Sequence, residues 1–349
     1  MRHAVGLLAI PFAVVTTVFA DPPKPPPAAD ASALSERNAM LAPIQVESLT
    51  LTPIVARQPA GAGGTVETPL VLDEAMAAKQ LAIQEIADGD VNSLTLVNRA
   101  SRPVFLLAGE VIIGGKQDRI IGRNTVIPAK TTQEVPVFCV EHGRWTGKTK
   151  EFTTARALAH GRLRGQASYA AQQDVWNEVS AKNKARKTET PSGTYRQVAQ
   201  QQSDGTLGAM EAQVNAALAR MPAADRARMV GYAVAFNGSV VTVDLFGSPA
   251  LFKKLETKLV RSYLTEAVDV TAQKDVTPPS PAAVKAFMVD ADKAAEQRSY
   301  DTAAAETKIN IGEHAAKAKV DYKPRPSAGG GKADTAPPAA ALYENYQQK

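Results

Sequence analysis

Residues 230–245 read VGYAVAFNGSVVTVDL, and this stretch predicts a β-hairpin. Two runs rich in β-branched and aromatic residues, Val230–Phe236 and Ser239–Leu245, lie on either side of Asn237-Gly238. This pair favours a two-residue type I′ turn, because both of its positions need a positive φ angle. The hairpin indicates antiparallel pairing in this half of the chain.

Helices are expected on both sides of the hairpin. Ser248 and Pro249 provide an N-cap and a first-turn proline for a helix through Tyr263. Before the hairpin, apolar residues recur with helical spacing over 162–184 and again over 207–221. The second half of the chain therefore combines helices with a hairpin.

The first half is typical of short strands. The β-rich segments, which tight turns separate, are Ile44–Leu51, Leu81–Ile86, Ser93–Asn98 and Val104–Leu107. One short helix is expected at Asp73–Lys79, with Asp73 as its cap. Strands first and helices later favour an α+β fold over a parallel doubly wound sheet. We predict an antiparallel sheet or sandwich in the N-terminal half, with helices and a further hairpin in the C-terminal half.

The two ends of the chain differ in composition from the middle. Residues 1–20 combine a basic start, an apolar run and small residues, which is the pattern of a cleavable signal peptide. Residues 21–39 are rich in proline and alanine and predict a linker. Residues 316–349 contain a glycine triplet and several prolines and predict a flexible tail. A single domain is expected over residues 40–315, in a protein exported to the periplasm or beyond, with no membrane span in the mature chain.

Composition excludes several classes of partner and cofactor. The formal net charge is +5, and the excess of basic residues over 144–187 has few aromatic residues among it, so it favours a solvated helical face over a nucleic-acid footprint. Cys139 is the only cysteine, so no intramolecular disulfide can form. The histidines lack the spacing of metal ligands. We expect no nucleic-acid partner, no metal and no cofactor, and the sequence does not indicate the oligomeric state.

Two glutamates are candidates for catalysis. If Val104–Glu110 is extended, Glu110 ends an apolar face, and Glu141 ends the face of Val135, Val137 and Cys139 in the same way. A pair of carboxylates suits general acid and base chemistry, since burial raises a carboxyl pKa. The alternative is that both are held in ion pairs that close the end of a sheet.

The segments around these glutamates also suggest a site for an anion. Two adjacent glycines give a tight turn with exposed amides, and cations and an aromatic ring follow in both segments. The candidate ligand-binding residues are Gly114, Gly115, Lys116, Gln117, Arg119, Arg144 and Trp145. Because the cations outnumber the two glutamates, we expect Arg144 to serve the ligand more than the stability of the fold. The alternative is a turn that only stabilises a hairpin.

Cys139 is expected to be structural. Phe138 and Val140 flank it, and a lone cysteine between bulky apolar residues is typical of a buried small hydrophobe. His142 is three residues away, which on a strand places the two side chains on opposite faces. The pattern argues against a cysteine nucleophile with a histidine base.

The same segments resemble a known family. Phe105–Glu110, Gly115–Arg119 and Cys139–Trp145 are similar to the ADP-ribosylglycohydrolase and rhodanese-phosphatase associated domain, and further echoes extend the resemblance over roughly residues 45 to 270. Asp118 stands where the family often has Asn, and His142 where it often has Gln. The family is named for its genomic company in ADP-ribose handling, so the resemblance implies a context and no particular reaction.

Two functions follow from these residues. The first is an exported module that binds an anionic small molecule, of nucleotide or ADP-ribose type, through the candidate ligand-binding residues. The second is a hydrolase in which Glu110 and Glu141 act as acid and base. A purely structural or interaction domain is the remaining alternative.

Overall fold

The protein is described by a computed structural model, which covers residues 37–57, 67–86, 91–145, 151–293, 296–323 and 340–349. These residues belong to one compact unit, residues 31–349. The predicted signal peptide and most of the predicted linker lie outside the described residues. The described part contains three β-sheets and eight α-helices, which confirms the α+β prediction.

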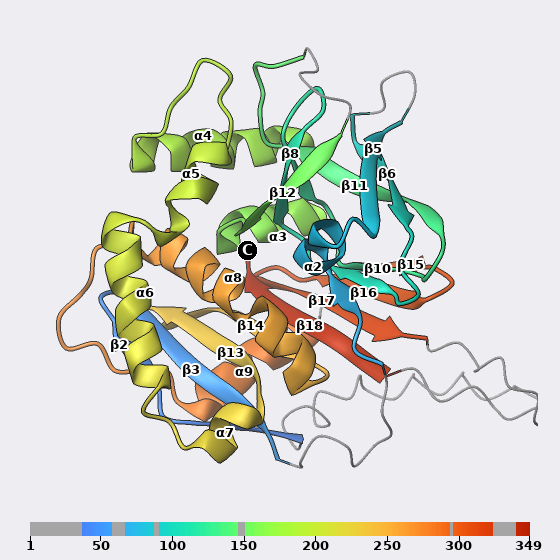
Figure 1. The fold of residues 1–349 in the computed structure, drawn as a ribbon. Coiled ribbons are helices and arrows are strands. Elements are labelled where there is room, and N and C mark those ends of the chain that lie inside the picture. Colours follow the sequence, from blue (N-terminus) through green and yellow to red (C-terminus); the bar gives the residue numbers. More distant parts are fainter. Residues whose placement is uncertain (1–36, 58–66, 87–90, 146–150, 294–295, 324–339) are drawn as a thin grey trace, which may run out of the picture. The chain divides into compact units, whose positions relative to one another are not determined.

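The largest sheet has nine antiparallel strands (Figure 1). Across the sheet they are β1 (Asn38–Met40), β3 (Leu49–Ala56), β13 (Met229–Phe236), β14 (Ser239–Phe246), β18 (Ala340–Gln348), β17 (Ala315–Tyr322), β16 (Ala305–Ile311) and β15 (Glu296–Asp301), while β2 (Ile44–Val46) pairs with β3. The predicted hairpin is β13 and β14. Its turn residues Asn237 and Gly238 have φ angles of 47° and 82°, as a type I′ turn requires.

The predicted strand at Ile44–Leu51 is divided in the structure. Glu47 has a φ angle of 52°, so the chain reverses there and β2 pairs with β3 as a second hairpin. The alternation of apolar and polar residues correctly indicates an extended backbone in this segment. It does not predict that Glu47 adopts a left-handed backbone conformation.

Two smaller sheets come from the segment between β3 and the helices. The six-stranded sheet has the order β12 (Phe152–Leu158), β8 (Glu110–Gly114), β9 (Arg119–Ile121), β11 (Thr132–Cys139), β6 (Ser93–Asn98) and β5 (Leu81–Glu85), and the three-stranded sheet has the order β10 (Thr125–Ile127), β7 (Val104–Leu106) and β4 (Leu70–Val71). β6 buries every second residue, so one face of its sheet packs on a core of leucine, isoleucine and valine.

The strand through Val104–Glu110 is also divided. β7 ends at Leu106, Gly109 takes a φ angle of 90°, and Glu110 begins β8. Glu110 therefore does not end the face of β7, as the periodicity predicted. It lies at the first position of the following strand.

The described helices are α2 (Leu72–Ala77), α3 (Gly161–Tyr169), α4 (Gln172–Arg186), α5 (Arg196–Gln200), α6 (Gly205–Leu218), α7 (Ala223–Ala227), α8 (Pro249–Ala267) and α9 (Pro281–Asp292). The predicted helix over 162–184 is two helices, because Ala170 and Ala171 are extended and Asp174 accepts a hydrogen bond from the Ala171 amide to start α4. Asp73 is not the cap of α2. Glu74 accepts the hydrogen bond from the Val71 amide instead.

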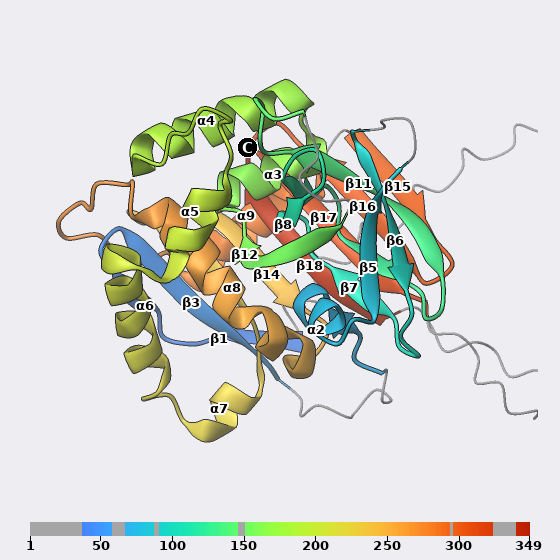
Figure 2. The same cartoon turned by 45° about the horizontal axis from the view of Figure 1, so that its top comes forward.

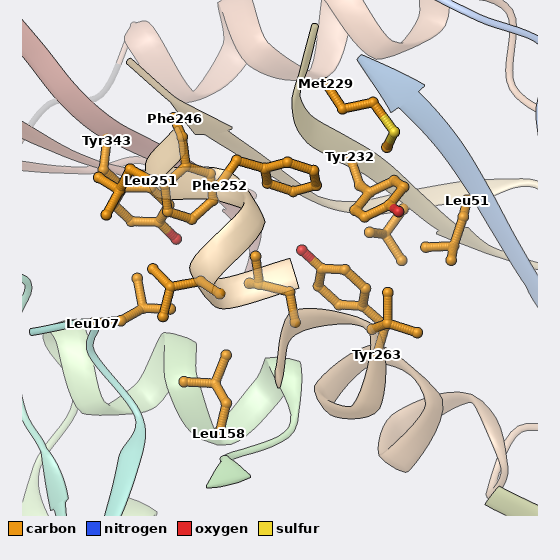
Figure 3. Close-up of a cluster of buried hydrophobic side chains, with 14 of the residues drawn as sticks. Leu51, Leu107, Leu158, Met229, Tyr232, Phe246, Leu251, Phe252, Tyr263 and Tyr343 are labelled. Atoms are coloured by element: carbon orange, nitrogen blue, oxygen red, sulfur yellow. The ribbon is translucent and has the colours of Figure 1, made fainter. Parts of the chain in front are cut away.

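Helix α8 begins as predicted and supplies much of the core. The Ser248 hydroxyl accepts a hydrogen bond from the Leu251 amide, and Pro249 opens the first turn. Leu251 and Phe252 lie among the aromatic side chains of the large sheet, with Leu107 and Leu158 of the smaller sheets on the other side (Figure 3).

Helices cover both faces of the large sheet. Tyr232 and Val234 of β13 pack in the cluster that contains α8, while Val230 and Ala233 pack with Val284 of α9. α6 packs against α8 in turn (Figure 2). No helix of the described part is long and apolar enough to cross a membrane.

The C-terminal segment differs from the predicted tail. Residues 316–322 belong to β17, and β18 lies between β14 and β17 inside the large sheet. Residues 324–339, with the glycine triplet and several prolines, lie outside the described residues. The flexible tail was predicted from the glycines and prolines of this connection. Tyr343 and Tyr346, which follow it in the chain, are nevertheless buried residues of the sheet.

Candidate functional site

The glycine turn lies between β8 and β9. Gly114 and Gly115 have φ angles of 136° and 52°, and a Cβ on Gly115 would lie 2.4 Å from the Phe152 ring and 2.6 Å from Glu85 Oε1. Glycine is therefore required on both conformational and steric grounds. The Gly114 amide donates to Asp118 Oδ1 (3.2 Å) and the Lys116 amide to Glu85 Oε1 (2.6 Å), so the protein itself uses these amides.

Arg144 joins the turn to the segment after β11. Its Nη1 donates to the Gly115 carbonyl (2.7 Å), and its Nη2 donates to Glu141 Oε2 (2.6 Å) and Asp118 Oδ1 (3.3 Å). Nε donates to Glu141 Oε2 as well (2.9 Å). We call this group the clasp: Arg144 with Gly114, Gly115, Asp118 and Glu141. All three guanidinium nitrogens are engaged, which gives Arg144 a structural role that the sequence did not predict.

Asp118 is the centre of the clasp, although it was not among the site residues predicted from the sequence. Its carboxylate is fully buried and also accepts hydrogen bonds from Arg196 Nη2 (2.7 Å), Arg196 Nε (3.0 Å) and the Thr194 hydroxyl (2.8 Å). Arg196 is the first residue of α5, more than 50 residues beyond the clasp motifs. No local sequence pattern marks Arg196 as part of the site.

Glu141 is ionised in this setting. Burial opposes its charge, but the hydrogen bonds from Arg144 and from the Asp118 amide outweigh burial and lower the pKa of the carboxyl. Gln117 is buried beside it and donates from Nε2 to the Glu141 carbonyl (2.9 Å). The predicted residues Gly114, Gly115, Gln117 and Arg144 thus meet, with Glu141, in one network.

Lys116 directly follows Gly115 in the chain, Trp145 directly follows Arg144, and Arg196 pairs with Asp118; we call these three residues the rim. Trp145 is 56 % exposed and is the large hydrophobic residue that stands out on the described surface. The Arg196 side chain is 35 % exposed, and its Nη1 donates to no acceptor among the described residues. The rim thus presents two cations and a ring beside a fixed backbone.

Arg119 lies beneath the cluster. Its side chain is buried, and it donates from Nε to the Val91 carbonyl (3.2 Å) and from Nη1 to the Asp118 carbonyl (3.4 Å). Burial lowers the pKa of the guanidinium. Arg119 adds positive charge to the cluster from inside and is not accessible at the rim.

Glu110 belongs to a different network. Its Oε1 accepts a hydrogen bond from Lys258 Nζ of α8 (2.7 Å), which also pairs with Asp73 (2.7 Å). Burial raises the pKa of Glu110, while for Lys258 the two carboxylates outweigh burial and raise the pKa of the ammonium. Glu110 and the clasp lie at opposite ends of β8, about 13 Å apart along an extended strand. The structure therefore does not bring Glu110 and Glu141 together.

Cys139 is buried, which agrees with the structural role predicted for it. It ends β11 between β6 and β9, and burial raises the pKa of the thiol. His142 is exposed and its ring packs edge-on against Trp176, at 4.5 Å between centroids. The two side chains form no dyad.

A second buried polar cluster lies between the large sheet and the helices. Asp244 accepts hydrogen bonds from Arg164 Nη2 (3.0 Å) and from the hydroxyls of Tyr263 and Tyr343. Burial raises the pKa of both tyrosine hydroxyls. All four residues are interior, so this cluster stabilises the join of β14, β18, α3 and α8. Among the described residues no group of His, Cys, Asp and Glu has the arrangement of a metal site.

The fold and the clasp define the class: an α+β protein with a charged, hydrogen-bonded cluster where two distant motifs meet. Comparison with protein families gives the membership. The model of the ARG and Rhodanese-Phosphatase-superfamily-associated Protein domain, ARPP-1, matches residues 38–325, and the chain belongs to this family, as the resemblance predicted. No curated protein and no solved structure matches the chain significantly.

Proposed function

We propose that the protein is an exported module that binds an anionic small molecule, of nucleotide or ADP-ribose type, at the rim. The observation that carries the proposal is a difference in hydrogen bonding between the clasp and the rim. The buried carboxylates of the clasp engage Arg144 fully, while the rim keeps donors and an aromatic ring that no described residue uses.

The rim has the chemistry of a phosphate site with a stacking surface. Asp118 holds two nitrogens of Arg196 and so fixes the plane of the guanidinium, with Nη1 left to donate. A guanidinium that is already oriented binds a phosphate oxygen at a smaller entropic cost. Trp145 supplies a flat surface for a base or another ring.

The charge of the cluster also favours an anion. Four cations, Lys116, Arg119, Arg144 and Arg196, lie together with the carboxylates of Glu85, Asp118 and Glu141 in a partly buried setting, and two of these cations belong to the rim. Hydrogen bonds and ion pairs inside such a setting are stronger than in water.

The hydrolase alternative finds less support. Acid and base need to reach the same reacting atoms, and Glu110 and Glu141 are separated by the length of β8. Both oxygens of the Glu110 carboxylate also accept hydrogen bonds already, from Lys258 Nζ and from the Leu107 amide. The proposal therefore does not include turnover by this pair.

Thermal melting with added anions tests the proposal. Inorganic phosphate, AMP, ADP and ADP-ribose are titrated at constant ionic strength against the wild type, Lys116→Ala and Trp145→Ala, with Lys184→Ala as a matched control on the exposed side of α4. A ligand at ten times its Kd should raise the melting temperature by roughly 2–3 °C. Quenching of tryptophan emission should accompany binding and disappear in Trp145→Ala, since the other tryptophan, Trp176, lies outside the rim.

The outcomes separate the alternatives. Stabilisation that both rim variants lose and Lys184→Ala keeps supports the proposal. No stabilisation by any of the four anions in the wild type would mean that the cluster is structural. Mass spectrometry of the same mixtures shows whether the ligand is converted, which a binding module would not do.

The proposed place of action is outside the cytoplasm. Residues 1–20 have the pattern of a signal peptide, and processing after Ala20 would start the mature chain at Asp21. N-terminal sequencing of the protein from a periplasmic or secreted fraction tests this. A mature chain that still begins at Met1 would contradict it.

A further inference from the structure

A cavity of about 260 Å³ lies where the start of α3, the end of α8, the β13–β14 hairpin and β18 meet. This volume is close to the lower end of small-molecule sites, roughly 300 Å³. Buried Thr242 and Tyr263 border its interior, while Arg162 and Lys349 border it at the exposed side. The cavity shares no residue with the clasp or the rim.

The polar wall of the cavity offers hydrogen-bond acceptors. Glu266 Oε2 accepts from the Arg162 amide (3.0 Å) and so caps α3, while its Oε1 accepts from no described residue. Gln347 is 6 % exposed and donates from Nε2 to the Gly161 carbonyl, which fixes the orientation of its amide. The Gln347 Oε1 therefore also remains without a donor in the described part of the chain.

The other wall is apolar and aromatic. Val234, Phe236 and Val241 of the hairpin form it together with the ring of Tyr263, whose hydroxyl is bound to Asp244. A carboxylate and an amide oxygen opposite aromatic rings suit an ammonium group, because the rings attract a cation from their faces. The apolar wall leaves room for a short aliphatic side chain.

The mouth of the cavity suits a negatively charged group, in contrast to its interior, which suits an ammonium group. The Arg162 side chain is 71 % exposed, and its closest described carboxylate, Glu178, is 3.8 Å away. A carboxylate on a ligand whose ammonium faces Glu266 would point toward this guanidinium. We infer that the cavity binds a small aliphatic amino acid, with its ammonium at Glu266 and Gln347 and its carboxylate at Arg162.

The inference is tested with three probes of one shape: L-leucine, 3-methylbutylamine, which lacks the carboxylate, and 4-methylpentanoate, which lacks the ammonium. Calorimetric titration and thermal melting of the full chain measure binding. L-leucine at ten times its Kd should raise the melting temperature by roughly 2–3 °C, and each half-ligand should bind at least tenfold more weakly.

Variants locate the site. Glu266→Gln keeps an oxygen for the Arg162 amide but removes the charge, so it should lower L-leucine affinity at least tenfold, and Glu313→Gln, at an exposed carboxylate, should not. Val241→Phe fills the apolar wall without a change of charge and should abolish binding, whereas Val241→Ala should retain it. Binding that survives both Glu266→Gln and Val241→Phe, or no binding of L-leucine to the wild type, overturns the inference. Equal binding of 3-methylbutylamine overturns the role of Arg162.

Discussion

Replacement of Arg144 by alanine tests whether the clasp is structural. The change removes the hydrogen bonds from Arg144 to Glu141, Asp118 and the Gly115 carbonyl. Glu141 is then buried without its ion-pair partner, and Asp118 keeps Arg196 as its cation together with the hydrogen bonds from Thr194 and Gly114. The glycine turn and the segment after β11 lose the guanidinium that joins them.

The magnitude follows from burial. Removal of one partner of a buried ion pair costs about 3–5 kcal/mol, because the remaining charge is uncompensated. The Arg144 side chain is 10 % exposed and Asp118 retains a second arginine, so we expect the lower end, about 3 kcal/mol. For a domain of this size, roughly 300 residues, the melting temperature should fall by roughly 4–6 °C.

The loss should depend on pH. The folded-state pKa of Glu141 is lowered, so its ion pair contributes stability above the unfolded value of about 4.3 and loses it as pH falls through the folded value. The gap between the wild type and Arg144→Ala should therefore be widest near pH 7. It should shrink as the pH falls below about 4.

Urea unfolding at a series of pH values measures both quantities. Arg162→Ala, at a well-exposed arginine, is the matched control and should stay near the wild type. Arg144→Lys should be intermediate, since a lysine keeps the charge but not the paired geometry. An Arg144→Ala protein that melts within 2 °C of the wild type, with a gap that does not change with pH, would refute the structural role of the clasp.

Three further changes probe other buried groups. Lys258→Met should destabilise by about 3–5 kcal/mol in urea, and Glu110→Gln in the same chain should restore part of the loss; additive losses would contradict the pairing. Cys139→Ser should cost about 1–3 kcal/mol, and the wild-type thiol should react with a thiol reagent only on unfolding; a fast-reacting thiol in the folded protein would count against burial. Burial lowers the folded-state pKa of His160, so wild-type stability should decline as the pH falls below about 6.5. In urea unfolding between pH 7 and about 5.5, the stability of His160→Gln should change less with pH than that of the wild type. Parallel profiles would rule out His160 as the titrating group.

The elements that the sequence predicted well are those with a local cause. The turn at Asn237-Gly238 and the start of α8 at Ser248 each depend on residues within four positions. The family motifs were also local enough to recognise. The hydrogen bond from Arg144 to the Gly115 carbonyl shows that the second motif and the glycine turn meet in the structure.

The elements that the sequence missed depend on distant partners. β18 is stabilised by pairing with β14 and β17, and no local pattern offset the prolines and glycines before it. Arg196 joins the cluster only through Asp118, and Lys258 reaches Glu110 only because α8 packs against β12, the strand that pairs with β8. The error at Glu110 has a conformational cause, since the turn at Gly109 moves it from the end of one strand to the start of the next.

Asp118 connects the structure of the clasp to the proposed function. An asparagine at this position would offer one side-chain oxygen to the arginines, whereas the carboxylate of Asp118 accepts from Arg144 at Oδ1 and from Arg196 at both oxygens. Compared with an asparagine, the aspartate therefore orients Arg196 more firmly and lowers the net charge of the cluster by one. For the proposed anion site, a donor fixed in this way favours recognition of one phosphate geometry over general affinity for anions.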